Sequence, residues 1–206
     1  MEDNAKYKSI MASAREIFWK HGVKRVSVEE ICRHAGVSKM TFYKLFPNKI
    51  ELAKHLYSKT LELALEEFRK LLKMDISPDE KIRKMIEMKM QGAHDISQEF
   101  IQDLYQNPEL GLKEFVDKLT GESWKSIVEY FREAQQEGVF RKDVRPEFIL
   151  YYSQKISEMV TDKGLLDLYN SPEEAIVELV RFFAYGVSNQ VQQPGTTTRH
   201  NNQAQP

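Results

Sequence analysis

The chain has 206 residues, of which 41% are hydrophobic and 30% are charged, and it contains a single cysteine. This balance is sufficient for one or two folded domains, argues against a disordered or fibrous chain, and excludes a disulfide framework. No apolar run approaches the roughly 18 residues of a membrane span. The polar start MEDNAKYKSI lacks the apolar core of a signal peptide, so we expect a cytoplasmic protein.

The net charge of −1 conceals two oppositely charged parts of the chain. Residues 1–60 contain 12 basic and 6 acidic side chains, a net charge of +6, and the remainder carries −7. A basic segment joined to an acidic one indicates that the first part alone contacts a polyanion. Chance clustering of charges on solvated faces would give the same count, and charge alone does not separate the two interpretations.

Helix signals follow one another along the chain, whereas alternating runs of the strand type are nearly absent. Residues 27–30 (Ser-Val-Glu-Glu) form a capping-box pattern, in which two side chains satisfy free backbone N–H groups at a helix start. Residues 77–78 and 171–172 both read Ser-Pro, with proline at the first helical position, where its missing N–H costs nothing. We therefore predict an all-α fold of about nine helices, at residues 5–20, 28–35, 39–45, 48–73, 78–94, 97–105, 108–137, 146–163 and 172–187.

Residues 27–46, SVEEICRHAGVSKMTFYKLF, are typical of two short helices around the turn at residues 35–38. Gly36 suits the left-handed position that ends the first helix, and Ser38 is a favourable N-cap for the second. A short helix, a glycine-containing turn and a second short helix make the helix-turn-helix pattern.

Helix geometry divides the second short helix into an inner and an outer face. At about 100° per residue, Phe42 and Phe46 share one face with Leu45 at its edge, and can pack on the helix at residues 5–20. The opposite face and the helix start offer cations, hydroxyls, a phenol and a thioether, which can reach phosphates and base edges in a major groove. An ordinary three-helix bundle with a polar surface is the alternative interpretation. The candidate DNA-binding residues here are Ser38, Lys39, Met40, Thr41, Tyr43 and Lys44.

Residues 8–55 also contain a series of motifs with a specific order and spacing. The motifs are Ala14-x-x-x-Phe18, Gly22, Ser27-Val28-x-x-Ile31, Ala35-Gly36-Val37-Ser38, Thr41-Phe42-Tyr43-x-x-Phe46 and Asn48-Lys49-x-x-Leu52. In these motifs the segment closely resembles the N-terminal domain of the TetR family of bacterial transcription regulators. The resemblance implies a helix-turn-helix DNA-binding domain at residues 1–47 and a helical regulatory and dimerisation domain at 48–187. The polar composition of residues 188–206 predicts a disordered tail.

The resemblance also assigns roles to individual residues. Residues implied to contact the DNA backbone are Ser27, Tyr43 and Lys49. Residues implied to face bases are Lys39, Met40 and Thr41, with Lys44 on a base or a phosphate. Two positions depart from the family pattern: Leu45 stands where a polar residue is common, and Met40 stands where glycine or proline is common.

In the family, the regulatory part dimerises through its last two long helices and usually encloses a small-molecule pocket. Apolar stripes at helical spacing agree with an interface here, although periodicity alone does not distinguish an interface from a core. The expected interface residues are Phe148, Tyr152, Ile156, Ile176, Leu179, Val180 and Phe183. Methionine and aromatic side chains suit an adaptable apolar pocket, but they also occur in any helical core. The candidate ligand-binding residues are Met85, Met88, Phe100, Tyr105, Trp124, Phe131, Tyr151 and Met159.

We therefore expect a homodimeric regulator of transcription, by default a repressor, whose two recognition helices lie about 34–36 Å apart on double-stranded operator DNA. A small apolar or amphipathic effector would tilt the helix that starts at Asn48 and release the DNA. A regulator controlled by partner proteins instead of a ligand is the alternative, and a solid core at residues 78–163 would favour it. Neither an enzyme, a cofactor nor a metal site is expected, because phosphate loops, metal-ligand spacings and nucleophile elbows do not occur. An interaction module without DNA binding is also disfavoured. The operator, the effector and the sign of regulation stay open.

Overall fold

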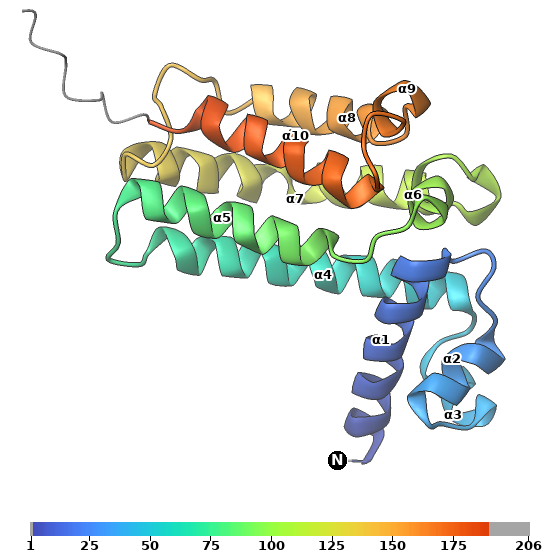
Figure 1. Ribbon diagram of the computed structural model, residues 1–206. Coiled ribbons are helices and arrows are strands. Elements are labelled where there is room, and N and C mark those ends of the chain that lie inside the picture. Colours follow the sequence, from blue (N-terminus) through green and yellow to red (C-terminus); the bar gives the residue numbers. More distant parts are fainter. Residues whose placement is uncertain (1, 190–206) are drawn as a thin grey trace, which may run out of the picture.

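The computed structural model describes residues 2–189, and within that range it confirms the predicted all-α class (Figure 1). The described chain forms ten α-helices and one 3-10 helix. Helices α1–α3 make a small head beneath one end of an elongated bundle of the remaining helices. The helices are α1 (Glu2–His21), α2 (Val28–Ala35), α3 (Lys39–Leu45), α4 (Lys49–Leu72), α5 (Pro78–Ala93), α6 (Gln98–Tyr105), η1 (Pro108–Leu110), α7 (Leu112–Gln136), α8 (Phe148–Met159), α9 (Lys163–Leu166) and α10 (Pro172–Val187).

Predicted helix starts carry the capping contacts that their sequence patterns indicate. A side-chain oxygen accepts hydrogen bonds from backbone N–H groups in the first turn of the following helix at Ser27, Ser38, Asn48, Ser77 and Ser171. Such a cap satisfies part of the set of four N–H groups that every helix leaves free at its start. These contacts are local in sequence, which explains why they could be anticipated.

Two predicted helices are interrupted. The helix expected at 108–137 begins as η1 and restarts as α7 after Gly111, which takes a left-handed conformation with φ of 58°. The helix expected at 146–163 is confined to α8, and the separate turn α9 begins after Asp162, whose carboxylate caps it. Both predicted spans were therefore wrong in their continuity, because caps inside them end one helix and start the next.

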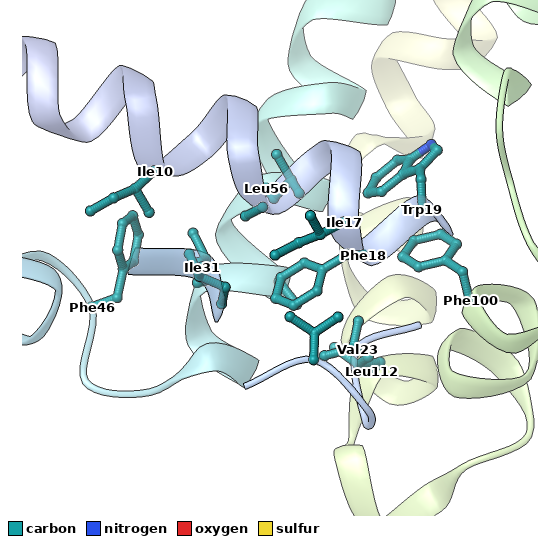
Figure 2. Packing of buried hydrophobic residues seen from close by; sticks show 14 of the residues in the cluster. Ile10, Ile17, Phe18, Trp19, Val23, Ile31, Phe46, Leu56, Phe100 and Leu112 are labelled. Carbon is teal, nitrogen blue, oxygen red and sulfur yellow. The ribbon is translucent and has the colours of Figure 1, made fainter. Parts of the chain in front are cut away.

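The head is held together by α1, which packs on α2 and α3. Ile10, Ala14 and Phe18 of α1 are buried without exposed surface, and the predicted inner residue Phe42 of α3 is buried with them. Figure 2 shows that the same cluster continues out of the head, where Trp19 lies beside Phe100 of α6. The cluster also includes residues from the start of α4 and the start of α7. One hydrophobic core therefore spans the predicted domain boundary at residues 47 and 48.

The bundle has a second core at its opposite end and little buried surface between the two. That far core joins the end of α4, the start of α5 and the end of α7 to the end of α10. Along α4, no residue is buried between Leu56 and Leu71, and along α7 none is buried between Val116 and Val128. The corresponding stretch of α5 is residues 87–92. The middle of the bundle therefore lacks the fully buried side chains that fill its two ends.

The chain after α10 turns back onto the end of α7. Ser188 and Phe140 form an isolated β-bridge, and the N–H of Asn189 donates to the carbonyl of Val139 at 3.0 Å. Packed structure therefore extends two residues past the predicted tail boundary, and the rest of that predicted tail, 190–206, lies outside the described residues. Among residues 2–189, no helix combines the length and the apolar composition needed to cross a membrane.

Candidate DNA-binding surface

The turn between α2 and α3 has the conformation that its sequence predicts. Gly36 is left-handed, with φ of 64°, and its N–H closes the end of α2 by donating to backbone carbonyls there. The hydroxyl oxygen of Ser38 accepts from the N–H of Thr41 at 3.1 Å, which starts α3. Glycine is suited to this position because a side chain would be strained at positive φ. The turn therefore fixes the angle at which α3 leaves α2.

Helix α3 presents the outer face that its sequence predicts. Phe42 is fully buried, whereas Met40 is 69% exposed and Tyr43 is 55% exposed. Lys44 is exposed as well, and it forms no ion pair with another residue of the described chain. Leu45 is half-buried and packs against the head core, so this departure from the family pattern leaves no apolar side chain stranded in solvent. The exposed face therefore combines a thioether, a phenol and a free cation.

Lys39 is already paired before any DNA is present. Its ammonium group contacts the carboxylate of Glu29 on α2. That contact raises the pKa of Lys39 and lowers the pKa of Glu29. Both side chains are exposed, so a phosphate or a base could replace Glu29 as the partner of the cation. Sequence analysis missed Glu29, although the proximity of α2 and α3 in any helix-turn-helix could have suggested such a pair.

Lys49 forms hydrogen bonds within the head, and its implied phosphate contact stays a prediction. Its ammonium group donates to the carbonyl oxygens of Lys24 at 2.6 Å and Val26 at 2.7 Å. Partial burial lowers the pKa of Lys49, and the charge of nearby Asp103 opposes this shift. The side chain therefore holds the loop between α1 and α2, which ends at Ser27. A direct phosphate contact would use only what remains of its donor capacity.

Ser27 combines a structural contact with an available donor. Its hydroxyl oxygen accepts from the N–H of Glu30 at 3.1 Å, which starts α2. A hydroxyl that accepts can still donate its own hydrogen to a phosphate oxygen. The start of α2 also directs free backbone N–H groups to the same side, as in many anion contacts at helix starts.

The head is attached to the bundle by specific polar and aromatic contacts. The rings of Trp19 and Phe100 stack with their centroids 4.3 Å apart, and the N–H of Ser97 donates to the carbonyl of Trp19 at 2.8 Å. The carboxylate of Asp103, which is buried, accepts from the N–H of Lys24 at 2.7 Å. Helix α6 therefore contacts both the end of α1 and the loop that leads to α2.

The candidate ligand-binding residues do not lie together. Met85 and Phe131 are buried in the far core, whereas Phe100 is buried in the core shared with the head. The exposed residues are Tyr151 and Met159 on α8. The half-buried residues, which retain surface for a ligand, are Met88, Tyr105 and Trp124.

The candidate dimer residues are also divided. Leu179 is buried inside the protomer, with Ile156 and Ile176 packed around it, and Val180 is half-buried. Phe148 is exposed, and Tyr152 stacks on Phe183 with ring centroids 4.8 Å apart. These last three residues line a groove of about 530 Å³ between α8 and α10. Sequence analysis missed two strongly exposed aromatic residues of α10, Phe182 and Tyr185.

Comparisons with known proteins agree with this geometry. Residues 10–56 match the family described as "Bacterial regulatory proteins, tetR family", and no curated protein matches the chain significantly. The fold resembles the fatty acid degradation regulator FadR from Bacillus halodurans, with a TM-score of 0.62, 20% identity, and coverage of 88% of this chain and 95% of that chain. The fold also resembles regulatory protein TetR from Rhodobacter sphaeroides, with a TM-score of 0.60, 19% identity, and coverage of 88% of this chain and 98% of that chain. For FadR from Bacillus subtilis, in complex with stearoyl-CoA, the TM-score is 0.59 at 19% identity, with coverage of 88% of this chain and 99% of that chain.

An exposed recognition helix on a helix-turn-helix head, joined to a helical bundle, defines a DNA-binding transcription regulator. Residues 10–56 carry the DNA-binding domain of the TetR family, and the chain shares its fold with solved regulators of this kind.

Proposed function

We propose that the protein is a homodimer that binds a two-fold symmetric operator, represses transcription, and leaves the operator when an amphipathic ligand binds in its regulatory part. The observation that carries this proposal is the outer face of α3, where Met40 and Tyr43 are exposed while Phe42 is buried. An apolar anchor with exposed polar and large side chains around it suits a helix that enters a major groove.

On DNA, the outer face would divide between reading bases and holding phosphates. Lys39, once released from Glu29, Met40 and Thr41 lie at the start of α3, where helix-turn-helix proteins contact base edges. Tyr43, Lys44 and Ser27 would hold phosphates on either side of the groove. Ser38 would keep its capping role, and Lys49 would act mainly by fixing the loop before Ser27.

Dimerisation supplies the second recognition helix that a specific operator needs. The face formed by α8 and α10 is the proposed interface, because Phe182 is 76% exposed, Tyr185 is 53% exposed, and Phe148 and Phe182 line the groove between the two helices. Aromatic side chains exposed together on a soluble surface mark interaction sites. A second copy of the same face would cover them symmetrically.

The ligand would occupy the sparsely filled middle of the bundle. FadR from Bacillus subtilis is described in complex with stearoyl-CoA, and FadR from Bacillus halodurans as a regulator of fatty acid degradation. A long amphipathic molecule of this kind fits a space between two separate cores better than a compact polar ligand does. Occupancy would move α4 and α6, and α6 touches the head through Trp19 and Lys24. The proposed domains are 1–47 for DNA binding and 48–187 for regulation.

Selection of bound DNA from a random pool, followed by mobility-shift titration of the selected site, tests the proposal. We expect a palindromic site, binding by two protomers, and a steep loss of affinity with salt. Transcription in vitro from a promoter containing this site should fall when the protein is added. A pool without enrichment, or an enriched site that leaves transcription unchanged or raises it, would count against repression through a symmetric operator.

A further inference from the structure

Lys89 lies on the inward face of α5, close to the centre of the bundle. Helix geometry places it in line with Met85 and Ala93, four residues before and after it, and both are buried. Lys81 lies on the same face nearer the helix start, and it is buried with its ammonium donating to the carbonyl of Leu72 at 2.6 Å. This other inward lysine of α5 therefore has an acceptor.

Lys89 has no such acceptor. No hydrogen bond or ion pair joins it to another residue within 2–189, and its side chain retains exposed surface. Surrounding protein nevertheless lowers the pKa of Lys89 through desolvation, with no contribution from a nearby charge. Lys89 is exposed although it lies between two buried residues of the same helix face, which indicates unfilled space beside that face.

The exposure of neighbouring helix segments also indicates a sparsely filled middle of the bundle. Met88 precedes it on α5, and Trp124 and Ile127 lie in the stretch of α7 that contains no buried residue. A Cβ added at Gly92, one turn further along α5, would meet no atom within 4 Å. Four acidic side chains on other helices pair with other lysines: the pairs are Glu62–Lys59, Glu66–Lys70, Glu122–Lys118 and Glu158–Lys155.

We propose that Lys89 binds the anionic head group of an amphipathic effector, whose apolar body lies along Met88 and Trp124. An unpaired cation away from bulk water is unfavourable, and a carboxylate or sulfonate of a ligand would supply the missing partner. Apolar walls with one well-placed charge are typical of a small-molecule site. The inference rests on the ligand site of the proposed function, and it restricts the ligand to molecules that carry a negative charge.

Two fluorescent probes that share an apolar body test the role of the charge. 1-Anilinonaphthalene-8-sulfonate carries a sulfonate, and N-phenyl-1-naphthylamine has the same rings without it. Titrations would compare the wild type with Lys89→Met, which keeps a long apolar side chain, and with Lys84→Met. Lys84 is on the same helix but about 140° around it from Lys89.

We expect Lys89→Met to weaken binding of the sulfonate probe at least tenfold. Its affinity for the uncharged probe should stay within twofold of that of the wild type. Lys84→Met should change neither affinity. The ligand-free Lys89→Met protein should melt at the same or a higher temperature, because an unpaired charge has been removed. A lower melting temperature would indicate a structural role for Lys89 and overturn the proposal.

The remaining outcomes separate this inference from the proposed function. If both probes bind and Lys89→Met leaves the sulfonate affinity unchanged, the assignment of Lys89 is wrong while the ligand site stands. If neither probe binds the wild type, the ligand site and Lys89 fail together. Operator binding, measured on the same preparations without probe, reports independently on the DNA-binding part.

Discussion

At the scale of single residues, the ammonium group of Lys49 stabilises the loop that carries the start of α2. Its two carbonyl acceptors, Lys24 and Val26, precede Ser27 directly. Loss of the ammonium removes two charge-assisted hydrogen bonds and leaves both carbonyls to water. We therefore expect this residue to affect DNA binding through the shape of the loop.

We predict that Lys49→Ala lowers the free energy of unfolding by about 1.5–3 kcal/mol, because a hydrogen bond to a charged group contributes this much. Chemical denaturation measures the loss, and Lys44→Ala, at an exposed position, should stay within about 0.5 kcal/mol of the wild type. If Lys49→Ala left stability unchanged and reduced the salt slope of DNA binding by about one, Lys49 would be a direct phosphate contact.

The pair formed by Lys39 and Glu29 gives a second residue-scale prediction. Glu29→Gln should raise operator affinity by a few-fold, since it frees the cation and removes a negative charge beside the DNA. Glu16→Gln, on the exposed side of α1, removes the same charge without freeing a lysine and should have a smaller effect. Mobility-shift titration at fixed salt compares them. Equal effects of the two substitutions would show that Lys39 is not restrained by Glu29.

Residue roles were predictable from sequence where they depend on near neighbours. The capping serines and the inner position of Phe42 follow from helix geometry over a few residues. The acceptors of Lys49 lie 23 and 25 residues away along the chain, and no local pattern contains them. The sequence therefore identified the outer face of α3 but not the acceptors of Lys49 at the start of α4.

At the scale of elements, the close approach of α1 and α6 depends on a single glycine. Gly22 ends α1 with φ of +77°, and a Cβ there would lie 2.6 Å from Oδ2 of Asp103 and 3.2 Å from Cβ of Glu99. Any other residue would therefore combine a strained backbone with a clash against α6. The contact between the loop after α1 and Asp103 would have to loosen.

We predict that Gly22→Ala destabilises the protein by more than the roughly 1–2 kcal/mol of left-handed strain alone. Gly138→Ala is the matched control, because its φ of +73° carries the strain but its added Cβ would meet no atom within 4 Å. Denaturation of both variants isolates the cost of the clash. Equal losses of unfolding free energy in the two variants would show that α6 shifts to accommodate the added Cβ at no energetic cost.

Elements were predicted well at their starts and less well in their orientation. Leu179 and Phe182 both lie on α10, for which an apolar stripe was predicted. Leu179 is buried, whereas Phe182 is 76% exposed. Periodicity identifies an apolar helix but does not say which part of its surface a neighbouring helix covers. The placement of α5 against α10, which decides this, depends on the whole bundle.

At the scale of the whole molecule, the proposed dimer interface is the exposed aromatic face of α8 and α10. We predict that Phe182→Glu gives a folded monomer in sedimentation velocity, because a charge in the centre of an apolar interface is costly to bury. It should bind the operator weakly at concentrations that saturate the wild type. Leu168→Glu, at another strongly exposed apolar residue, should remain dimeric. A dimer of unchanged stability in Phe182→Glu would place the interface elsewhere.

The core that runs from α1 through α4 into α6 and α7 limits how this regulator can be recombined with others. In a hybrid that replaces residues 1–47 alone, the side chains of another protein would take the places of Trp19 and Val23. They would pack poorly against Phe100 and Leu112, and the hybrid would be less stable. A hybrid should fold stably when α6 and the start of α7 are taken from the same protein as the head. The part of this protein that must be transferred as one piece to transfer DNA recognition is therefore larger than its helix-turn-helix.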